Sequence, residues 1–153
     1  MGSGKSTVAF AVAALLGRQA IDLDRVIESE AGESIAGIFS GEGEAGFRRR
    51  EAGALREQLD GPVVLALGGG ALLDEGSWQL VRESATSIWL DAPLKVLWQR
   101  AGEDPLRPHS LERGEFERRF RARRRRYAEC DHRVDADRPV LEIAEEVARL
   151  CGG

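Results

Sequence analysis

The sequence predicts an α/β fold, a doubly wound parallel sheet flanked by helices. Short apolar runs alternate along the chain with segments of helical periodicity, as in strand–helix–strand units. One run, residues 62–67, is apolar throughout, which is typical of a parallel strand covered on both faces. Acidic residues or glycines follow two of these runs, at the carboxyl ends of the strands, where sheets of this kind bind ligands.

Composition limits the class of protein further. A chain of 153 residues with 42% hydrophobic residues suits one domain, residues 1–153, with its own core. The net charge of -4 argues against a general nucleic-acid binder, which needs a basic surplus. The apolar runs are too short to cross a bilayer, and we see no secretory leader. Two widely separated cysteines form no disulfide framework or metal cluster, so we expect a cytoplasmic protein with reduced thiols.

The first half of the chain is mainly helical. Val8, Val12 and Leu15 recur at helical spacing, and Gly17 suits the residue after the helix end. Ser34 is a suitable N-cap for a helix that follows it. We predict a helix over 6–16, a strand over 20–24, and helices over 25–31, 35–39 and 47–59.

The second half continues the alternation. After the strand at 62–67 come three consecutive glycines, and residues 103–110 hold two prolines without periodicity, which predicts a loop. Strands joined by helices require right-handed crossovers, so the sheet should be mostly parallel. We predict strands over 86–90 and 133–135, and helices over 77–82, 94–100, 116–127 and 141–150.

The chain opens with a phosphate-binding motif. Gly4, Lys5 and Ser6 match the end of the G-K-[ST] loop, and a helix follows at once. Glycines let backbone N–H groups point at phosphate oxygens, and the helix adds its positive end. Lysine can bridge the β- and γ-phosphates, while the hydroxyl can hold Mg²⁺. A chance cluster at a frayed terminus is the alternative, and the helix argues against it.

The motif lacks its first glycine and the strand that should lead into it. In a doubly wound sheet this strand is central. Losing about five buried apolar residues at roughly 1.5–3 kcal/mol each would remove on the order of 10 kcal/mol. That is comparable to the entire net stability of a domain, about 5–15 kcal/mol. We therefore expect the working protein to begin upstream of Met1, by the length of a strand and turn, roughly ten residues.

Two carboxylates mark the end of the first predicted strand. Asp22 and Asp24 are two residues apart, so in a strand their side chains share one face. One could reach the hydration shell of Mg²⁺, and the other could accept a proton from an attacking hydroxyl. The alternative is a strand-to-helix turn in which Asp24 caps the helix.

Other candidate residues lie farther along. Arg48 and Glu51, at i and i+3, can pair and present a rigid guanidinium fork to a planar anion, although a solvated charged face is the alternative. The glycines at 68–70 permit close approach to a ligand. The loop with Arg107 could be a lid that brings this arginine onto a transferring phosphate. Most arginines of the 116–127 helix should be solvated or paired, with one facing the site.

The ordered set of motifs resembles the shikimate kinase family over nearly the whole chain. The resemblance is carried by Gly2–Thr7, Asp22-Leu23-Asp24, Phe47-Arg48-Arg49 with Glu51, Leu67-Gly68-Gly69-Gly70, Arg107-Pro108, and Arg123 four residues before Tyr127. It implies an ATP-dependent kinase that uses Mg²⁺ to phosphorylate the 3-hydroxyl of shikimate in chorismate and aromatic amino-acid biosynthesis. It also implies a five-stranded sheet of order 2-3-1-4-5, whose strand 1 is the one missing here. Separately from the resemblance, we expect a monomer.

The resemblance assigns a role to individual residues. Lys5, Asp24 and Arg107 would be catalytic, Asp24 being the candidate base and Arg107 lying on a lid at about 102–115. Mg²⁺ would be held by Ser6 and, through water, by Asp22. ATP would contact Gly2, Ser3, Gly4, Lys5, Ser6, Thr7, Arg100, Arg107 and Arg138. Shikimate would contact Asp24, Arg48, Gly69, Gly70 and Arg123, the two arginines gripping its carboxylate.

Two other functions stay open at this stage. Paired arginines and a carboxylate would also suit a kinase of another hydroxylated acid, such as gluconate. The incomplete loop would suit a catalytically impaired module that only binds nucleotide. The full set of lysine, carboxylate and arginines argues against the second, because a binding module needs no such set.

Overall fold

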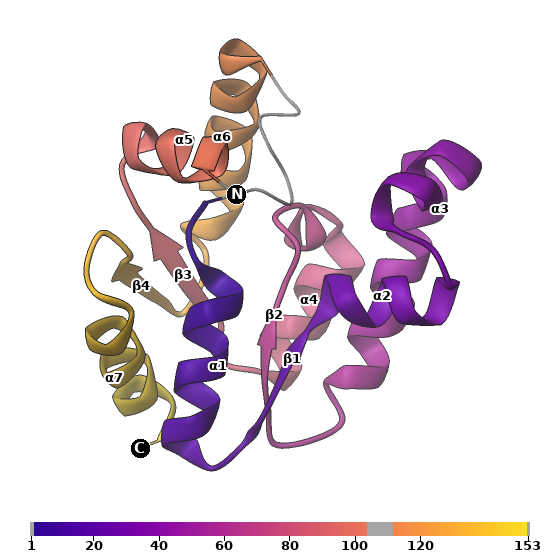
Figure 1. The fold of residues 1–153 in the computed structure, drawn as a ribbon. Coiled ribbons are helices and arrows are strands. Elements are labelled where there is room, and N and C mark those ends of the chain that lie inside the picture. The colour runs from indigo at the N-terminus through magenta and orange to yellow at the C-terminus, as the bar shows by residue number, and fades with distance from the viewer. Residues whose placement is uncertain (1, 104–111, 153) are drawn as a thin grey trace.

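The computed structural model describes residues 2–103 and 112–152, in which helices surround two short parallel sheets (Figure 1). The α/β class and the parallel pairing are confirmed. The order of elements is α1 Lys5–Leu16, β1 Gln19–Asp22, α2 Leu23–Ala31, α3 Ile35–Gln58, β2 Val63–Ala66, a 3₁₀ turn Ala71–Leu73, α4 Glu75–Ser84, β3 Ile88–Asp91, α5 Leu94–Glu103, α6 Arg113–Tyr127, β4 His132–Asp135 and α7 Val140–Cys151.

The four described strands form two separate parallel pairs. Strand β1 pairs with β2, with Ile21 opposite Leu65, and β3 pairs with β4, with Leu90 opposite Val134. Among the described strands, β2 and β3 therefore each have one unpaired edge. The two pairs agree with the outer strands of the expected order 2-3-1-4-5, in which strand 1 would lie between them.

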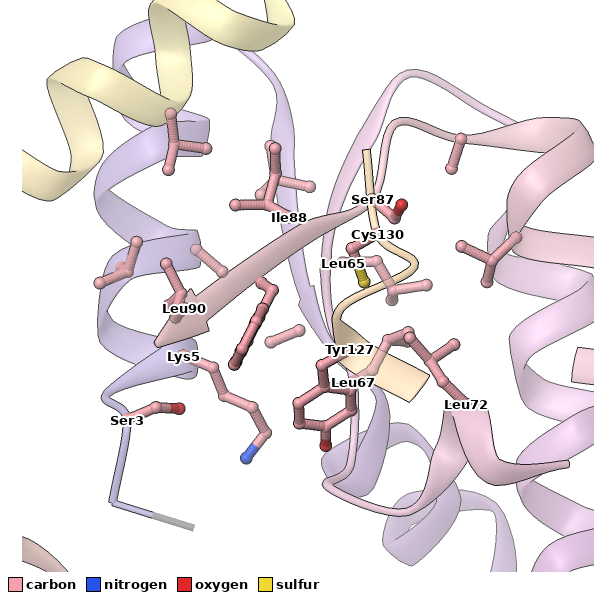
Figure 2. A pocket seen from close by; sticks show the side chains of 18 of the residues that line it. Ser3, Lys5, Leu65, Leu67, Leu72, Ser87, Ile88, Leu90, Tyr127 and Cys130 are labelled. Atoms are coloured by element: carbon pink, nitrogen blue, oxygen red, sulfur yellow. The ribbon is translucent and has the colours of Figure 1, made fainter. Parts of the chain in front are cut away.

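An apolar cavity of about 550 Å³ occupies the space between the sheets (Figure 2). Its walls come from α1, β2 and β3, and include Val12, Leu65 and Leu90. The prediction that the strand at 62–67 is buried on both faces is wrong for most of β2. Of its residues only Ala66 is fully buried, and all four border this cavity. Lys5 and Tyr127 reach the carboxyl end of the same space.

Helix α1 packs against β1 and β2 on one side and against α7 on the other. Its buried face includes Val8 and Val12, and Gly17 ends it in the left-handed conformation, as the sequence predicts. Buried side chains gather in two clusters. One cluster lies around Val12, Val134 and Ile143, and the other around Leu23, Leu55 and Trp78.

The boundary between β1 and α2 differs from the sequence prediction at the two aspartates. The first strand ends at Asp22, and α2 begins at Leu23, so Asp24 lies in the first helical turn. The reason is that Asp22, rather than Asp24, is the N-cap and accepts a hydrogen bond from the Asp24 backbone N–H at 3.1 Å. The prediction that both aspartates share a strand face is therefore wrong.

The predicted helices at 35–39 and 47–59 are parts of one element, α3. Ser34 caps it as expected, through the Gly37 N–H. Gly43 interrupts the helical backbone with φ 70° and ψ -177°, so the element bends there. Within the described residues, 2–103 and 112–152, no helix is both long enough and apolar enough to span a membrane.

Candidate active site

The amino-terminal loop leads directly into α1. Gly2 and Gly4 have φ values of 73° and 74°, a left-handed backbone that favours glycine. A Cβ on Gly2 would also lie 2.5 Å from the Leu97 carbonyl oxygen of α5. Helix α1 starts at Lys5 without a side-chain cap, so its first N–H groups are available to an anion. Figure 2 shows the Lys5 side chain extending into the space beside Tyr127.

The next side chain reaches the end of β1. Ser6 Oγ donates a hydrogen bond to Asp22 Oδ2 at 2.5 Å, which brings together the two predicted metal residues. A hydroxyl and a carboxylate are hard oxygen ligands of the kind that Mg²⁺ prefers. The described residues contain no cluster of three metal-binding histidine, cysteine or carboxylate side chains. Mg²⁺ bound with a nucleotide fits this pair, because it commonly keeps waters and phosphate oxygens as its other ligands.

Three consecutive glycines after β2 lie against different charged side chains. A Cβ on Gly68 would lie 2.9 Å from Glu51 Oε1 and 3.0 Å from Asp24 Oδ1. On Gly69 it would lie 2.5 Å from Arg123 Nη1, and on Gly70 it would lie 2.9 Å from Arg48 Cζ. A side chain at any of these positions would displace the charged group beside it, so the absence of a Cβ allows the close approach. The loop gathers two carboxylates and two guanidinium groups in one place.

Glu51 holds Arg48 within this cluster. Arg48 Nη1 lies 2.5 Å from Glu51 Oε2, as the i, i+3 spacing predicts. Glu51 is buried, and its Oε1 has no hydrogen-bond partner among the described residues. Burial raises the pKa of Glu51 above its ordinary 4.5, and the Arg48 guanidinium opposes this shift. A ligand hydroxyl near Oε1 would satisfy the unpaired oxygen.

Arg123 is the arginine of α6 that faces the glycines. Burial lowers the pKa of its guanidinium, and the nearby positive charge of Arg48 adds to this effect. Two partly desolvated cations near one another favour a bound anion between them. One turn later, Tyr127 Oη donates to the Gly69 carbonyl oxygen at 2.5 Å.

The other arginines of α6 are mostly paired, as expected. Arg119 pairs with Glu115 at 2.6 Å, and Arg126 pairs with Glu75 at 2.5 Å. Arg124 makes two hydrogen bonds to the buried Asp91 of β3, at 2.9 and 3.2 Å. The two hydrogen bonds from Arg124 to Asp91 join α6 to β3, and Arg123 is the adjacent residue of the same helix.

The residues predicted to lie near the adenine base come from α5 and the β4–α7 loop. Arg100 donates to the Ala136 carbonyl oxygen at 2.8 Å and to Asp137 Oδ1 at 3.2 Å. Arg138 bonds the Asp135 carbonyl oxygen at 3.3 Å and pairs with Glu146. The partners of Arg100 therefore lie on this loop, whereas those of Arg138 lie at the end of β4 and on α7. Arg107 and most of the predicted lid lie outside the described residues.

The sequence alone predicts no role for Tyr127, and it predicts Glu51 only as a partner of Arg48. The i, i+4 spacing of Arg123 and Tyr127 is the feature of the sequence that could have placed Tyr127 near the site, because it puts both residues on one face of a helix. The buried setting of Glu51 had no signal, because its neighbours Gly68 and Asp24 are distant in sequence.

A glycine–lysine–serine loop leads into a helix beside a parallel sheet. The same region holds a hydroxyl–carboxylate pair and an anion-binding cluster. Together these features define a phosphate-loop kinase of a small molecule. A sequence model described as "Shikimate kinase" matches residues 1–151. The chain belongs to the shikimate kinase family.

Individual relatives agree with this assignment. Shikimate kinase of Salinibacter ruber is 40% identical over 98% of this chain and 80% of its own length. The structure of shikimate kinase from Acinetobacter baumannii in complex with shikimate has a TM-score of 0.91 and 31% identity, covering 98% of this chain and 87% of that one. A gluconokinase from Sinorhizobium meliloti shares the fold, with a TM-score of 0.66 and 22% identity over 99% of this chain and 89% of that one.

Proposed function

We propose that the chain transfers the γ-phosphate of ATP to the 3-hydroxyl of shikimate, giving shikimate 3-phosphate and ADP. The glycine loop carries this proposal, since Gly68, Gly69 and Gly70 lie against carboxylates, Arg123 and Arg48 respectively. A carboxylate flanked by neighbouring hydroxyls is complementary to such an arrangement. The relative whose structure is a complex with shikimate supports the choice of acid.

The roles follow from the chemistry of each group. Lys5 and the first N–H groups of α1 bind the phosphates and stabilise charge on the transferring group. Arg48 and Arg123 hold the substrate carboxylate, and the Gly70 N–H holds a hydroxyl. The Asp24 carboxylate, near Gly68, accepts the proton of the attacking hydroxyl. Arg107 would act from the lid, and Arg100 and Arg138 on the adenine side of ATP.

Mg²⁺ belongs to the proposal as well. Ser6 would bind it directly and Asp22 through water, and when bound it neutralises phosphate charge. The hydrogen bond of 2.5 Å between the two side chains supports this site, since it places both oxygens together. We further propose a monomer in the cytoplasm. The free thiols of Cys130 and Cys151 support a reducing compartment, and gel filtration tests the monomer.

A coupled assay of ADP release tests the proposal against its two alternatives. We expect ADP formation that depends on shikimate and on Mg²⁺, with little release in their absence. Release with gluconate but not shikimate would favour a kinase of another hydroxylated acid. Nucleotide binding without any turnover would favour an impaired nucleotide-binding module.

Replacing Arg48 tests the carboxylate grip. In Arg48→Ala we expect the shikimate KM to rise by the equivalent of roughly 2–5 kcal/mol, because the variant leaves the substrate carboxylate without its partly buried partner. The ATP KM should change little. The neighbouring Arg49 is exposed, so Arg49→Ala is the matched control. An unchanged shikimate KM in Arg48→Ala would remove this residue from the substrate site.

The raised pKa of Glu51 predicts a pH-dependent shikimate KM. As pH falls through this raised pKa, Glu51 becomes neutral and holds Arg48 less firmly, so the shikimate KM should rise. Because the pKa is raised, this rise should begin at a higher pH than it would for a glutamate with the ordinary pKa.

The same raised pKa affects the free energy of unfolding. The stability that Glu51 contributes is fully present below its unfolded pKa of about 4.5, and it is lost as pH rises through the higher pKa of the folded chain.

Steady-state kinetics over this acidic range check the prediction. Glu51→Gln should have a raised KM at neutral pH and lose the acidic rise. Glu57→Gln, an exposed position on the same helix, is the control and should keep the original profile. An acidic rise that persists in Glu51→Gln would assign the titration to another group.

A further inference from the structure

Tyr127 contacts the loop that the proposed function uses, yet that function gives it no role. It is the last residue of α6, its side chain is largely buried, and its hydroxyl donates to the Gly69 carbonyl oxygen at 2.5 Å. Its ring lies 6.3 Å from that of Trp89, centroid to centroid. The tyrosine lines the cavity together with Leu67, the residue that precedes the three glycines (Figure 2).

The hydrogen bond fixes a peptide plane. The Gly69–Gly70 peptide is trans, so the Gly69 carbonyl and the Gly70 N–H point in opposite directions. Since the carbonyl points at Tyr127, the N–H points away from α6. Two glycines without Cβ atoms leave this plane free to rotate, and a bond to one carbonyl selects one orientation.

The Gly70 N–H is itself placed for a ligand. Gly70 is buried, and within residues 2–103 and 112–152 no group accepts a hydrogen bond from its N–H. A buried N–H without an acceptor is costly, and a bound oxygen would satisfy it. The Arg48 guanidinium lies against the same glycine, and Arg123 lies against Gly69.

We propose that Tyr127 is a positioning residue for substrate recognition: its hydroxyl holds the Gly69–Gly70 peptide so that the Gly70 N–H donates to a substrate hydroxyl. This proposal rests on the proposed function and deepens it. The i, i+4 spacing places Tyr127 and Arg123 on one face of α6, so a single helix turn sets both the loop amide and an arginine of the carboxylate site. Burial raises the pKa of Tyr127, which keeps its hydroxyl protonated as a donor.

The variant Tyr127→Phe retains the ring and deletes only the hydroxyl. We expect the shikimate KM to rise about tenfold, as for one lost hydrogen bond, with the ATP KM nearly unchanged. Ser87→Ala is the matched control, because it also deletes a hydroxyl. The Ser87 hydroxyl donates to Asp131 at 2.7 Å and makes no hydrogen bond to the glycine loop in the described residues. Its shikimate KM should stay at the value of the unmodified chain.

Substrate analogues separate positioning from general packing. The unmodified chain should discriminate against one monodeoxy shikimate, the analogue that lacks the hydroxyl bound by Gly70. Tyr127→Phe should lose the discrimination against this analogue and keep the discrimination against the other monodeoxy analogues. Altered packing alone would not couple the tyrosine hydroxyl to one substrate hydroxyl in this way. An unchanged KM, or an equal loss for every analogue, would overturn the proposal. If the unmodified chain did not respond to shikimate at all, the proposed function would fail instead.

A second measurement does not depend on the variant's folding. Tyr127 is the chain's single tyrosine, so 3-fluorotyrosine incorporated throughout labels this position alone. Addition of shikimate should shift its ¹⁹F resonance, because the loop it holds becomes engaged. A resonance that does not respond to saturating shikimate would contradict the proposal.

Discussion

Asp24→Asn should lower turnover by about 10²–10⁴-fold while ATP binding survives, because the variant removes the proton acceptor without touching the phosphate loop. The side chain lies in the first turn of α2, with Oδ1 3.0 Å from a Cβ built on Gly68. Asparagine keeps the size of the side chain and leaves the backbone N–H that Asp22 caps. Single-turnover kinetics and nucleotide titration measure the two effects separately.

Asp60 offers a matched control for this substitution. It is exposed and lies outside the described helices and strands, so Asp60→Asn should leave both turnover and ATP affinity unchanged. Equal turnover in Asp24→Asn and the unmodified chain would discard Asp24 as the base. A loss of ATP binding in Asp24→Asn would show instead that this carboxylate supports the nucleotide site.

The second large effect concerns the cavity between β2 and β3. Joining an extended apolar segment of about five residues and a glycine turn ahead of Met1 should raise the free energy of unfolding by on the order of 10 kcal/mol. Both facing strand edges lack partners among the described strands, and the cavity between them is largely apolar. A parallel segment there would gain two rows of backbone hydrogen bonds as well as burial. Denaturant unfolding followed by tryptophan fluorescence measures the change.

The control for this experiment is a segment of equal length made of glycine and serine. It lacks the apolar side chains that would fill the cavity, so its effect on the unfolding midpoint should be small. Equal midpoints for the apolar and polar fusions would contradict the interpretation of the cavity as a place for a strand.

Local signals predicted much of this fold. Hydrophobic periodicity located α1 and α7, and the apolar run located β2, because these patterns reflect burial directly. The prediction failed at Asp24, where a helix cap shortened the strand, because the competing capping geometries look alike in sequence.

The candidate site was predictable in its parts and not in its assembly. The phosphate loop and the Arg48–Glu51 pair follow from spacing within one segment. The contacts of Gly68 with Asp24 and of Gly69 with Arg123 join residues far apart along the chain, and only the tertiary structure brings them together. Family resemblance supplied these residues, whereas the hydrogen bond from Tyr127 to Gly69 appeared only in three dimensions.

If ATP and a hydroxylated acid meet at the glycine loop, ³¹P NMR of the reaction mixture should detect phosphate passing from one to the other. Both the unmodified chain and the apolar fusion should be incubated with ATP, Mg²⁺ and shikimate. We expect one phosphate monoester of shikimate, esterified at the 3-hydroxyl, to appear for each ADP formed. If the fusion binds ATP but forms no phosphate ester with shikimate, the chain is not a kinase of shikimate.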